Sequence, residues 1–216
     1  MNRNYQVIDP NKLAKRKQFH WFNTFSNPCY FVNVKMDVTN LLEKSHSTNT
    51  SFFVNLIYII GSELQKIEEF RYRIYKEEVR LYEVIHIGVA VATKSGMFEN
   101  LDTEFIDDYD IFYKKTKNLV DEIKEREEVK ETFNDDENFN YFYFSCVPWL
   151  NFDSINHALP NGNKESLTVP RVSWSKYYLD NEKYYLTLNI CASHTFVDGE
   201  PMSRAFNNIQ KALDLF

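Results

Sequence analysis

The chain has 216 residues, of which 44% are hydrophobic and 16% aromatic, so residues 1–216 can form one packed domain and a disordered chain is excluded. Its 31 acidic and 25 basic side chains give a net charge of −6, and without a concentrated Lys/Arg stripe the sequence does not predict nucleic-acid binding. No apolar run approaches the length of a membrane span, and three widely spaced cysteines support neither a metal site nor a disulfide framework, so we expect a cytoplasmic protein.

The first predicted element is a helix over residues 9–22, because Asp9 and Pro10 are typical of a helix N-cap and of the first helical position. A strand is predicted over residues 29–38, and apolar residues at helical spacing predict a helix over residues 51–69. The next segments indicate a hairpin over residues 72–82 and two strands over residues 85–93 and 96–105.

A charged helix is expected over residues 110–130, with Lys and Glu on a solvated face. The aromatic run 141–144 favours a strand buried on both faces. Residues 151–169 are expected to be irregular, with an exposed tip at residues 160–163. Strands over 171–178 and 184–193 precede a helix from about residue 201. Because strands and helices mix without a regular βαβ repeat, the sequence predicts an α+β two-layer sandwich, one large mixed β-sheet covered by helices on one face.

The first candidate site is an H-x-x-x-D-G motif formed by His194, Asp198 and Gly199, between the last predicted strand and the terminal helix. A histidine at a strand end is held by a rigid sheet, and its ordinary pKa near neutrality suits proton abstraction. Residue frequencies give this motif by chance in about one chain of this length in fifty. Alone, it also fits an ordinary histidine beside a helix-capping aspartate.

The second candidate is an S-x-x-P-W-x-x-F motif that runs from Ser145 to Phe152, at the exit of the aromatic strand. Trp and Pro are both uncommon, so chance produces this pattern in roughly a few chains in ten thousand. Its structural alternative is a proline turn with a core tryptophan.

With Arg16, these residues resemble the chloramphenicol acetyltransferase family. The resemblance runs in the same order through residues 15–17, Phe22, residues 28–31, the serine–proline–tryptophan segment, residues 176–178 and the histidine motif. It implies the fold of CoA-dependent acyltransferases and an enzyme that moves an acetyl group from acetyl-CoA to a hydroxyl of chloramphenicol, which inactivates the antibiotic. It further implies a cytoplasmic homotrimer in which the pocket of one subunit faces the catalytic histidine of its neighbour.

The resemblance implies that His194 is the general base in a direct transfer without an acetyl-enzyme, and that Ser145 donates a hydrogen bond to the oxyanion. Removing such a donor typically costs about 10²–10³ in rate. Asp198 is expected to pair with Arg16 and thereby tie the first helix to the site, and Ser173 stands where the family usually has a threonine that holds a water. The binding residues that the resemblance implies are, for CoA, Trp149 and Tyr177, and, for the acceptor, Phe22, Cys29, Phe31 and Phe98.

Four residues depart from the family pattern. Ser193 replaces the first of two adjacent histidines, and Asn23 replaces what is often an aromatic residue. Ile155 and His157 stand where the family tends to place a phenylalanine and an apolar residue. These changes concern the acceptor more than the chemistry, because an added histidine would make the pocket wetter.

Three alternatives remain at this point. The same chemistry could act on another hydroxylated acceptor. The acyltransferase core of 2-oxoacid dehydrogenase complexes shares the histidine motif, but such chains normally carry a lipoyl domain and linker, of which nothing precedes Asp9. A trimeric small-molecule binder without catalysis would keep the fold, although the presence of both His194 and Ser145 argues against it.

Overall fold

The computed structural model describes residues 5–129, 139–160 and 163–216. Its strands are β1 Tyr5–Ile8, β2 Cys29–Asp37, β3 Tyr72–Tyr75, β4 Glu78–Tyr82, β5 His86–Ala92, β6 Phe98–Thr103, β7 Tyr141–Val147, β8 Arg171–Ser175, β9 Tyr178–Asp180 and β10 Lys183–Ser193. Its α-helices are α1 Arg16–Phe22, α2 Thr39–Ser47, α3 Phe52–Gln65, α4 Tyr109–Lys124 and α5 Gly199–Leu215. Three short 3₁₀ helices are η1 Pro10–Lys12, η2 Glu68–Phe70 and η3 Ser166–Thr168.

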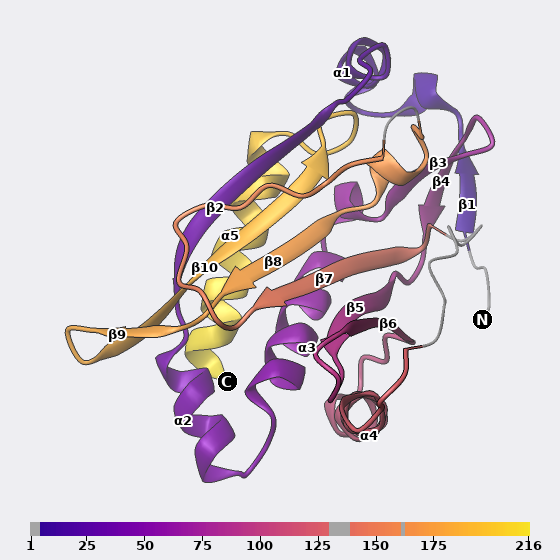
Figure 1. The fold of residues 1–216 in the computed structure, drawn as a ribbon. Coiled ribbons are helices and arrows are strands. Elements are labelled where there is room, and N and C mark those ends of the chain that lie inside the picture. The colour runs from indigo at the N-terminus through magenta and orange to yellow at the C-terminus, as the bar shows by residue number, and fades with distance from the viewer. Residues whose placement is uncertain (1–4, 130–138, 161–162) are drawn as a thin grey trace.

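The main sheet is mixed, as the sequence predicts. Its strands follow the order β2-β10-β8-β7-β5-β6, and β9 adds to β10. β7 runs parallel to both β5 and β8, whereas the other pairs are antiparallel. Figure 1 shows α2, α3 and α5 behind this sheet, on the face away from the viewer. The predicted α+β two-layer architecture is therefore confirmed.

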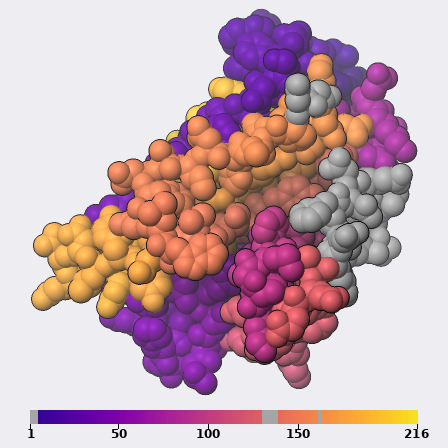
Figure 2. Space-filling model, viewed as in Figure 1, coloured from indigo at the N-terminus to yellow at the C-terminus, as the bar shows by residue number. Residues whose placement is uncertain are grey.

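Side chains alternate between the two faces of each strand, and the helices cover the apolar face. Phe142, Phe144, Val172, Trp174 and Ile190 are all buried there. The intervening residues face the other side, which we call the open face. In Figure 2 the orange atoms of the chain after β7 lie across part of this face. Polar side chains on the open face therefore gain cover from a loop segment instead of from a helix.

The N-terminal part differs from the prediction of one helix over residues 9–22. Asp9 does cap a helix, because its carboxylate accepts from the Asn11 amide at 3.0 Å, but that helix is only η1. Leu13 is extended, with ψ of 137°, and α1 starts again at Arg16. The cap was read correctly, whereas the break that follows it carries no proline or glycine signal.

The strand predicted over residues 171–178 ends as β8 at Ser175, and the separate strand β9 follows from Tyr178. Two further elements were not predicted. β1 joins the predicted β3–β4 hairpin to form a second sheet of three strands, and α2 fills the gap between β2 and α3. The N-terminus of α2 is fixed by Asp37, whose Oδ1 accepts from the Thr39 amide and hydroxyl. In the sequence, the only sign of this cap is an Asp two residues before a Thr. Within the described residues, no helix is both long and apolar enough to cross a membrane.

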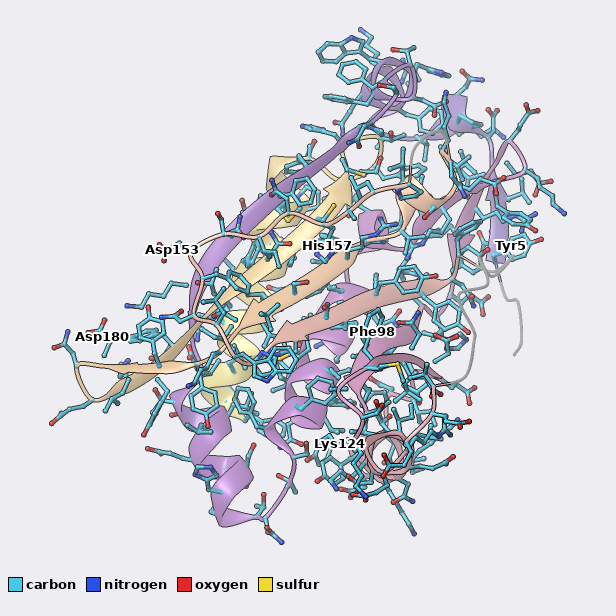
Figure 3. The ribbon with its side chains drawn as sticks, viewed as in Figure 1. Tyr5, Phe98, Lys124, Asp153, His157 and Asp180 are labelled. Carbon is cyan, nitrogen blue, oxygen red and sulfur yellow. The ribbon has the colours of Figure 1, made fainter. Side chains whose placement is uncertain are left out.

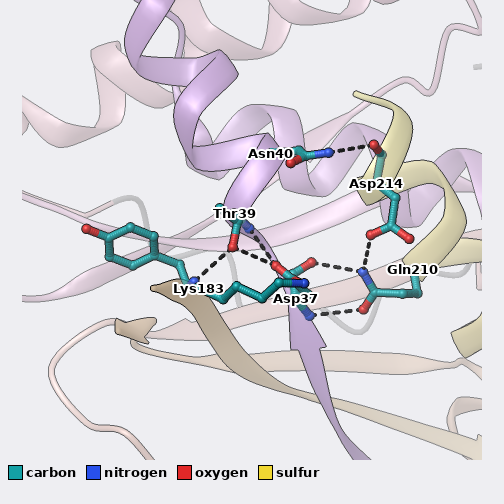
Figure 4. A network of polar contacts seen from close by, with 7 residues as sticks. Asp37, Thr39, Asn40, Lys183, Gln210 and Asp214 are labelled. Atoms are coloured by element: carbon teal, nitrogen blue, oxygen red, sulfur yellow. Dashed lines mark hydrogen bonds and ion pairs between the residues drawn. The ribbon is translucent and has the colours of Figure 1, made fainter. Parts of the chain in front are cut away.

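A polar network ties the far end of the sheet to its helices (Figure 4). Asp37 at the end of β2 binds Lys183 at the start of β10 at 2.8 Å. Gln210 of α5 donates to the Asp37 carbonyl and accepts from its amide, both at 3.0 Å. These contacts fix β2 and β10 in register, which positions the residues at the opposite end of the same two strands.

Candidate active site

His194 stands directly after β10, at the end of the sheet beside α1. Its amide donates to the Pro28 carbonyl at 2.8 Å, which extends the β10–β2 pairing by one bond. Its own carbonyl accepts from Gln18 of α1, also at 2.8 Å. The backbone of the histidine is therefore held from both sides before the chain turns into α5.

The imidazole of His194 is held by two aromatic rings. Phe22 stacks on it with 4.0 Å between ring centroids and 12° between planes, and Tyr30 lies 4.8 Å away at 36°. Nδ1 is buried and has no hydrogen-bond partner among the described residues, whereas Nε2 is not enclosed in this way. Nε2 is therefore the nitrogen that can reach an incoming group.

The partner of Asp198 differs from the prediction. Its carboxylate binds Lys15 at 2.7 Å, and Arg16 is exposed on the first turn of α1. The cause is the late start of α1, because Lys15 occupies the N-cap position and its side chain reaches the start of α5. Asp198 is itself the N-cap of α5 and accepts from the Glu200 amide at 3.2 Å. A carboxylate does connect α1 to the histidine loop, but through the neighbouring lysine.

Three of the four predicted acceptor residues lie near His194. Phe22 stacks on its ring, and Cys29 and Phe31 lie on β2 opposite Ser193 and Cys191. A hydrogen bond from Cys191 lowers the pKa of the Cys29 thiol, and the charge of Arg171 acts in the same direction, while burial opposes both. The Cys29 thiol donates to the Leu167 carbonyl at 3.2 Å.

A row of polar residues crosses the open face in direct register. Ser145 of β7 lies opposite Ser173 of β8, which lies opposite Asn189 of β10, which lies opposite Asn33 of β2. Asn189 donates to the Asn33 side chain at 2.9 Å and to the Ile155 carbonyl at 3.0 Å. This row places Ser173, predicted as a supporting residue, directly beside Ser145.

His157 lies over this row, as Figure 3 shows. Its Nε2 is 3.1 Å from the Ser173 hydroxyl, and Ser173 is only 1% exposed. Burial and, to a smaller extent, the nearby charge of Arg171 lower the pKa of His157 to about 4, against a hydrogen bond with Asn189 that raises it, so the ring is neutral at physiological pH. A neutral imidazole offers one donor and one acceptor to the open face.

Ser145 also lines a pocket of about 820 Å³ at the other end of the sheet. The predicted CoA residues Trp149 and Tyr177 line the same pocket, together with Phe98 and two cations, Lys124 and Lys176. The Trp149 side chain is 77% exposed. Phe98 was predicted as an acceptor residue, but it lines the pocket of the predicted CoA residues. It lies on β6 (Figure 3), at the opposite edge of the sheet from Phe31 on β2.

Within one chain the two predicted catalytic side chains are far apart. His194 lies five residues beyond Asn189, and Asn189 is two strands away from Ser145. A rise of about 3.3 Å per residue and a strand spacing of about 4.8 Å put the two backbones about 15–20 Å apart. The two regions are therefore separate within one chain, and we call them the His194 half-site and the Ser145 half-site.

The sequence analysis assigned no site role to Lys15, Tyr30, Lys124 or Lys176. Lys124 comes from α4 and Lys176 from the turn after β8, and only the fold brings them to the Ser145 pocket. No spacing pattern could link them, because they lie about fifty residues apart. Within the described residues, no group of three or more His, Cys, Asp or Glu side chains could hold a metal ion.

Solved structures share this arrangement of sheet and helices. The chain matches a chloramphenicol acetyltransferase with a TM-score of 0.89 at 21% identity, over 97% of this chain and 100% of that one. It matches a probable dihydrolipoamide acetyltransferase from Listeria monocytogenes with a TM-score of 0.62 at 11% identity, over 97% and 94% of the two chains. These likenesses show the fold, which is that of the CoA-dependent acyltransferases.

Sequence comparison narrows this class. Residues 3–210 match the chloramphenicol acetyltransferase family. The chain is 28% identical over 214 residues to the chloramphenicol acetyltransferase of Vibrio anguillarum, with 97% of this chain and 94% of that protein covered. It is 28% identical over 211 residues to that of Staphylococcus aureus, with 95% and 94% covered. The chain belongs to the chloramphenicol acetyltransferase family and is an acetyltransferase.

Proposed function

We propose that the chain transfers an acetyl group from acetyl-CoA to a hydroxyl of chloramphenicol, and that His194 and Ser145 carry the reaction. The observation that supports this most is the pair of half-sites. One presents an imidazole whose Nε2 can accept a proton, and the other presents a serine hydroxyl inside a large pocket. Each half lacks what the other holds.

The large pocket suits CoA. Trp149, Tyr177 and Phe98 give it apolar walls, and Lys124 and Lys176 supply positive charge for phosphate groups. The carbonyl of a thioester bound along this pocket would lie next to Ser145. This arrangement supports placing the acetyl donor in the Ser145 half-site and the acceptor in the His194 half-site.

In the proposed reaction, Nε2 of His194 takes the proton of the acceptor hydroxyl while that oxygen attacks the thioester carbonyl. The carbonyl electrons move to its oxygen, and the Ser145 hydroxyl donates a hydrogen bond to this oxyanion. The intermediate collapses, the C–S bond breaks, and the thiolate of CoA takes the proton back from the imidazolium. No acetyl-enzyme forms.

The half-sites can combine only between copies of the chain. We infer a cytoplasmic homotrimer in which His194 of one subunit faces Ser145 of the next, as the family resemblance implies. A rotationally symmetric ring repeats one such heterologous contact around its axis. With the acceptor acetylated, the antibiotic would be inactivated for the host.

A second candidate is the same chemistry on a more polar alcohol. It is favoured by the neutral imidazole of His157 and the hydroxyl of Ser173, which contact each other on the open face near Phe31. A polar wall favours acceptors that can pair with its groups, since an unpaired buried polar group costs free energy.

The test is release of free thiol from acetyl-CoA, measured with chloramphenicol and with a panel of other alcohols. We expect chloramphenicol-dependent release by the parent, a loss of at least about 10² in kcat for His194→Ala, and a loss of about 10²–10³ for Ser145→Ala. If thiol release depends on another alcohol and not on chloramphenicol, that alcohol is the acceptor and the proposal of chloramphenicol is wrong. Equal rates in parent and His194→Ala would refute the mechanism.

A further inference from the structure

The segment that follows the tryptophan motif lies across the open face of the sheet (Figure 2). We call residues 151–159 the strap. It is irregular, but the half-buried side chains of Ile155, His157 and Leu159 alternate with the exposed ones of Asn156 and Ala158. This alternation is typical of extended chain with one side turned to a surface. The strap therefore needs contacts that hold it at one height over the sheet.

Two asparagine side chains bind both backbone polar groups of Ile155. The Ile155 amide donates to Asn33 Oδ1 at 3.3 Å, and its carbonyl accepts from Asn189 Nδ2 at 3.0 Å. The same Nδ2 donates to Asn33 Oδ1 at 2.9 Å. A backbone N–H can only donate and a backbone C=O can only accept, so Ile155 fixes which atom of each amide faces it. We call this arrangement the amide clamp.

The sheet sets the two asparagines in place before the strap is added. Asn33 of β2 and Asn189 of β10 are direct partners in the register, and Asn189 is fully buried. An amide at this depth is costly unless its polar atoms are paired. Lifting the strap would remove a partner from each amide and both partners from Ile155. The clamp thus favours the closed strap.

The height of the strap decides where His157 lies. This residue follows Ile155 by two positions, and its Nε2 is 3.1 Å from the Ser173 hydroxyl. Its ring is parallel to that of Phe31, with 6.4 Å between centroids and 11° between planes. Ser173 is the register partner of Ser145. The inner side of the strap therefore borders both the oxyanion donor and a predicted acceptor residue.

The start of the strap is held separately. The Leu150 carbonyl accepts from the Lys176 amide at 3.0 Å, and this contact lies beside Trp149 and Tyr177 at the large pocket. A loss of the amide clamp should therefore loosen the strap around Ile155 and leave the CoA residues in place.

We propose that Asn33 and Asn189 are positioning residues that clamp the strap closed and thereby set the affinity for the acceptor alcohol. The inference rests on the proposed function of the chain. Neither asparagine touches the reacting atoms in this role, because both act through Ile155 and the strap residues that follow it.

The decisive pair of variants is Asn33→Leu and Asn33→Asp. Leucine has a similar size and no acceptor, whereas aspartate keeps an oxygen where Ile155 and Asn189 donate. In Asn33→Leu we expect the KM for the acceptor to rise about tenfold, the loss of about one hydrogen bond, with kcat and the KM for acetyl-CoA unchanged. Deuterium exchange at residues 153–157 should also become about tenfold faster. Asn33→Asp should return both values to those of the parent.

Gln65→Leu is the matched control. The Gln65 side chain accepts from the Ile85 amide at 3.0 Å and donates to the Ile85 carbonyl, so it makes the same kind of clamp in neither half-site. It should lose stability and keep both KM values and the exchange at residues 153–157.

Three results overturn the inference. They are unchanged exchange at residues 153–157 in Asn33→Leu, an equal rise of both KM values, and a higher acceptor KM that Asn33→Asp does not reverse. If the parent releases no thiol with any alcohol, the proposed function fails. The exchange measurement, which needs no activity, then decides whether Asn33 holds the strap.

Discussion

His157 shows how one side chain can set both the character of a site and the acid stability of the fold. Burial holds its pKa at about 4, below its ordinary value of 6.5. Between these values the unfolded chain binds a proton that the folded chain refuses, so the free energy of unfolding falls as the pH drops through this window. The effect is about 1–2 kcal/mol once partial exposure is allowed for.

His157→Gln should remove this dependence, because glutamine can still contact Ser173 but does not titrate. Urea unfolding at pH 7 and pH 4 measures it. The parent should lose about 1–2 kcal/mol more than the variant between the two pH values. The exposed His20 gives the control, since His20→Gln should behave as the parent does. An equal loss of unfolding free energy in the parent and in His157→Gln would show that folding does not lower the pKa of His157.

At the scale of elements, Asp198 joins α1 to α5 in two ways of unequal weight. Its ion pair with Lys15 is partly exposed, with 39% and 25% of the two side chains accessible, and such pairs contribute about 0–1 kcal/mol. Its role as N-cap of α5 is worth about 0.5–2 kcal/mol. The cap therefore outweighs the ion pair.

Three variants separate these contributions. Asp198→Asn keeps a good capping side chain and should cost less than about 1 kcal/mol, whereas Asp198→Ala should cost about 1–2 kcal/mol. Lys15→Met should match Asp198→Asn and add nothing to it in the double variant. Arg16→Met is the control and should leave stability unchanged. A larger loss of stability for Arg16→Met than for Lys15→Met would show that Asp198 pairs with Arg16, as the sequence analysis expected.

The elements best predicted from the sequence are those with strong local signals. Ser51 caps α3 by accepting from the Val54 amide. The predicted hairpin over residues 72–82 appears as β3 and β4, and its turn residues Lys76 and Glu77 adopt the positive φ that two-residue hairpin loops favour. The predicted helix over residues 110–130 appears as α4, and its last residue, with the tip residues 161–162, lies outside the described residues.

The site was predictable only in part, for a physical reason. His194 and Ser145 stand in motifs whose chemistry is local, and so the sequence indicates them. The Lys15 pairing depends on where α1 begins, and the neighbours of Nδ1 depend on which face of β2 Tyr30 occupies. Such contacts arise from packing between segments far apart in the chain, which no local pattern records.

At the scale of the whole molecule, the central claim is that the active site forms between copies of the chain. The sheet separates His194, the proposed base, from Ser145, the proposed oxyanion donor, by about 15–20 Å, and no rotation of either side chain closes such a gap. The claim predicts that two inactive variants can repair each other when they share one assembly.

The direct measurement is activity after His194→Ala and Ser145→Ala chains are denatured together and refolded as a mixture. Each variant alone should be inactive. In random mixed rings about a quarter of the contacts join an intact His194 to an intact Ser145, so the mixture should regain about a quarter of the parent activity. A mixture that refolds into mixed assemblies and stays inactive would show that both residues must come from the same chain.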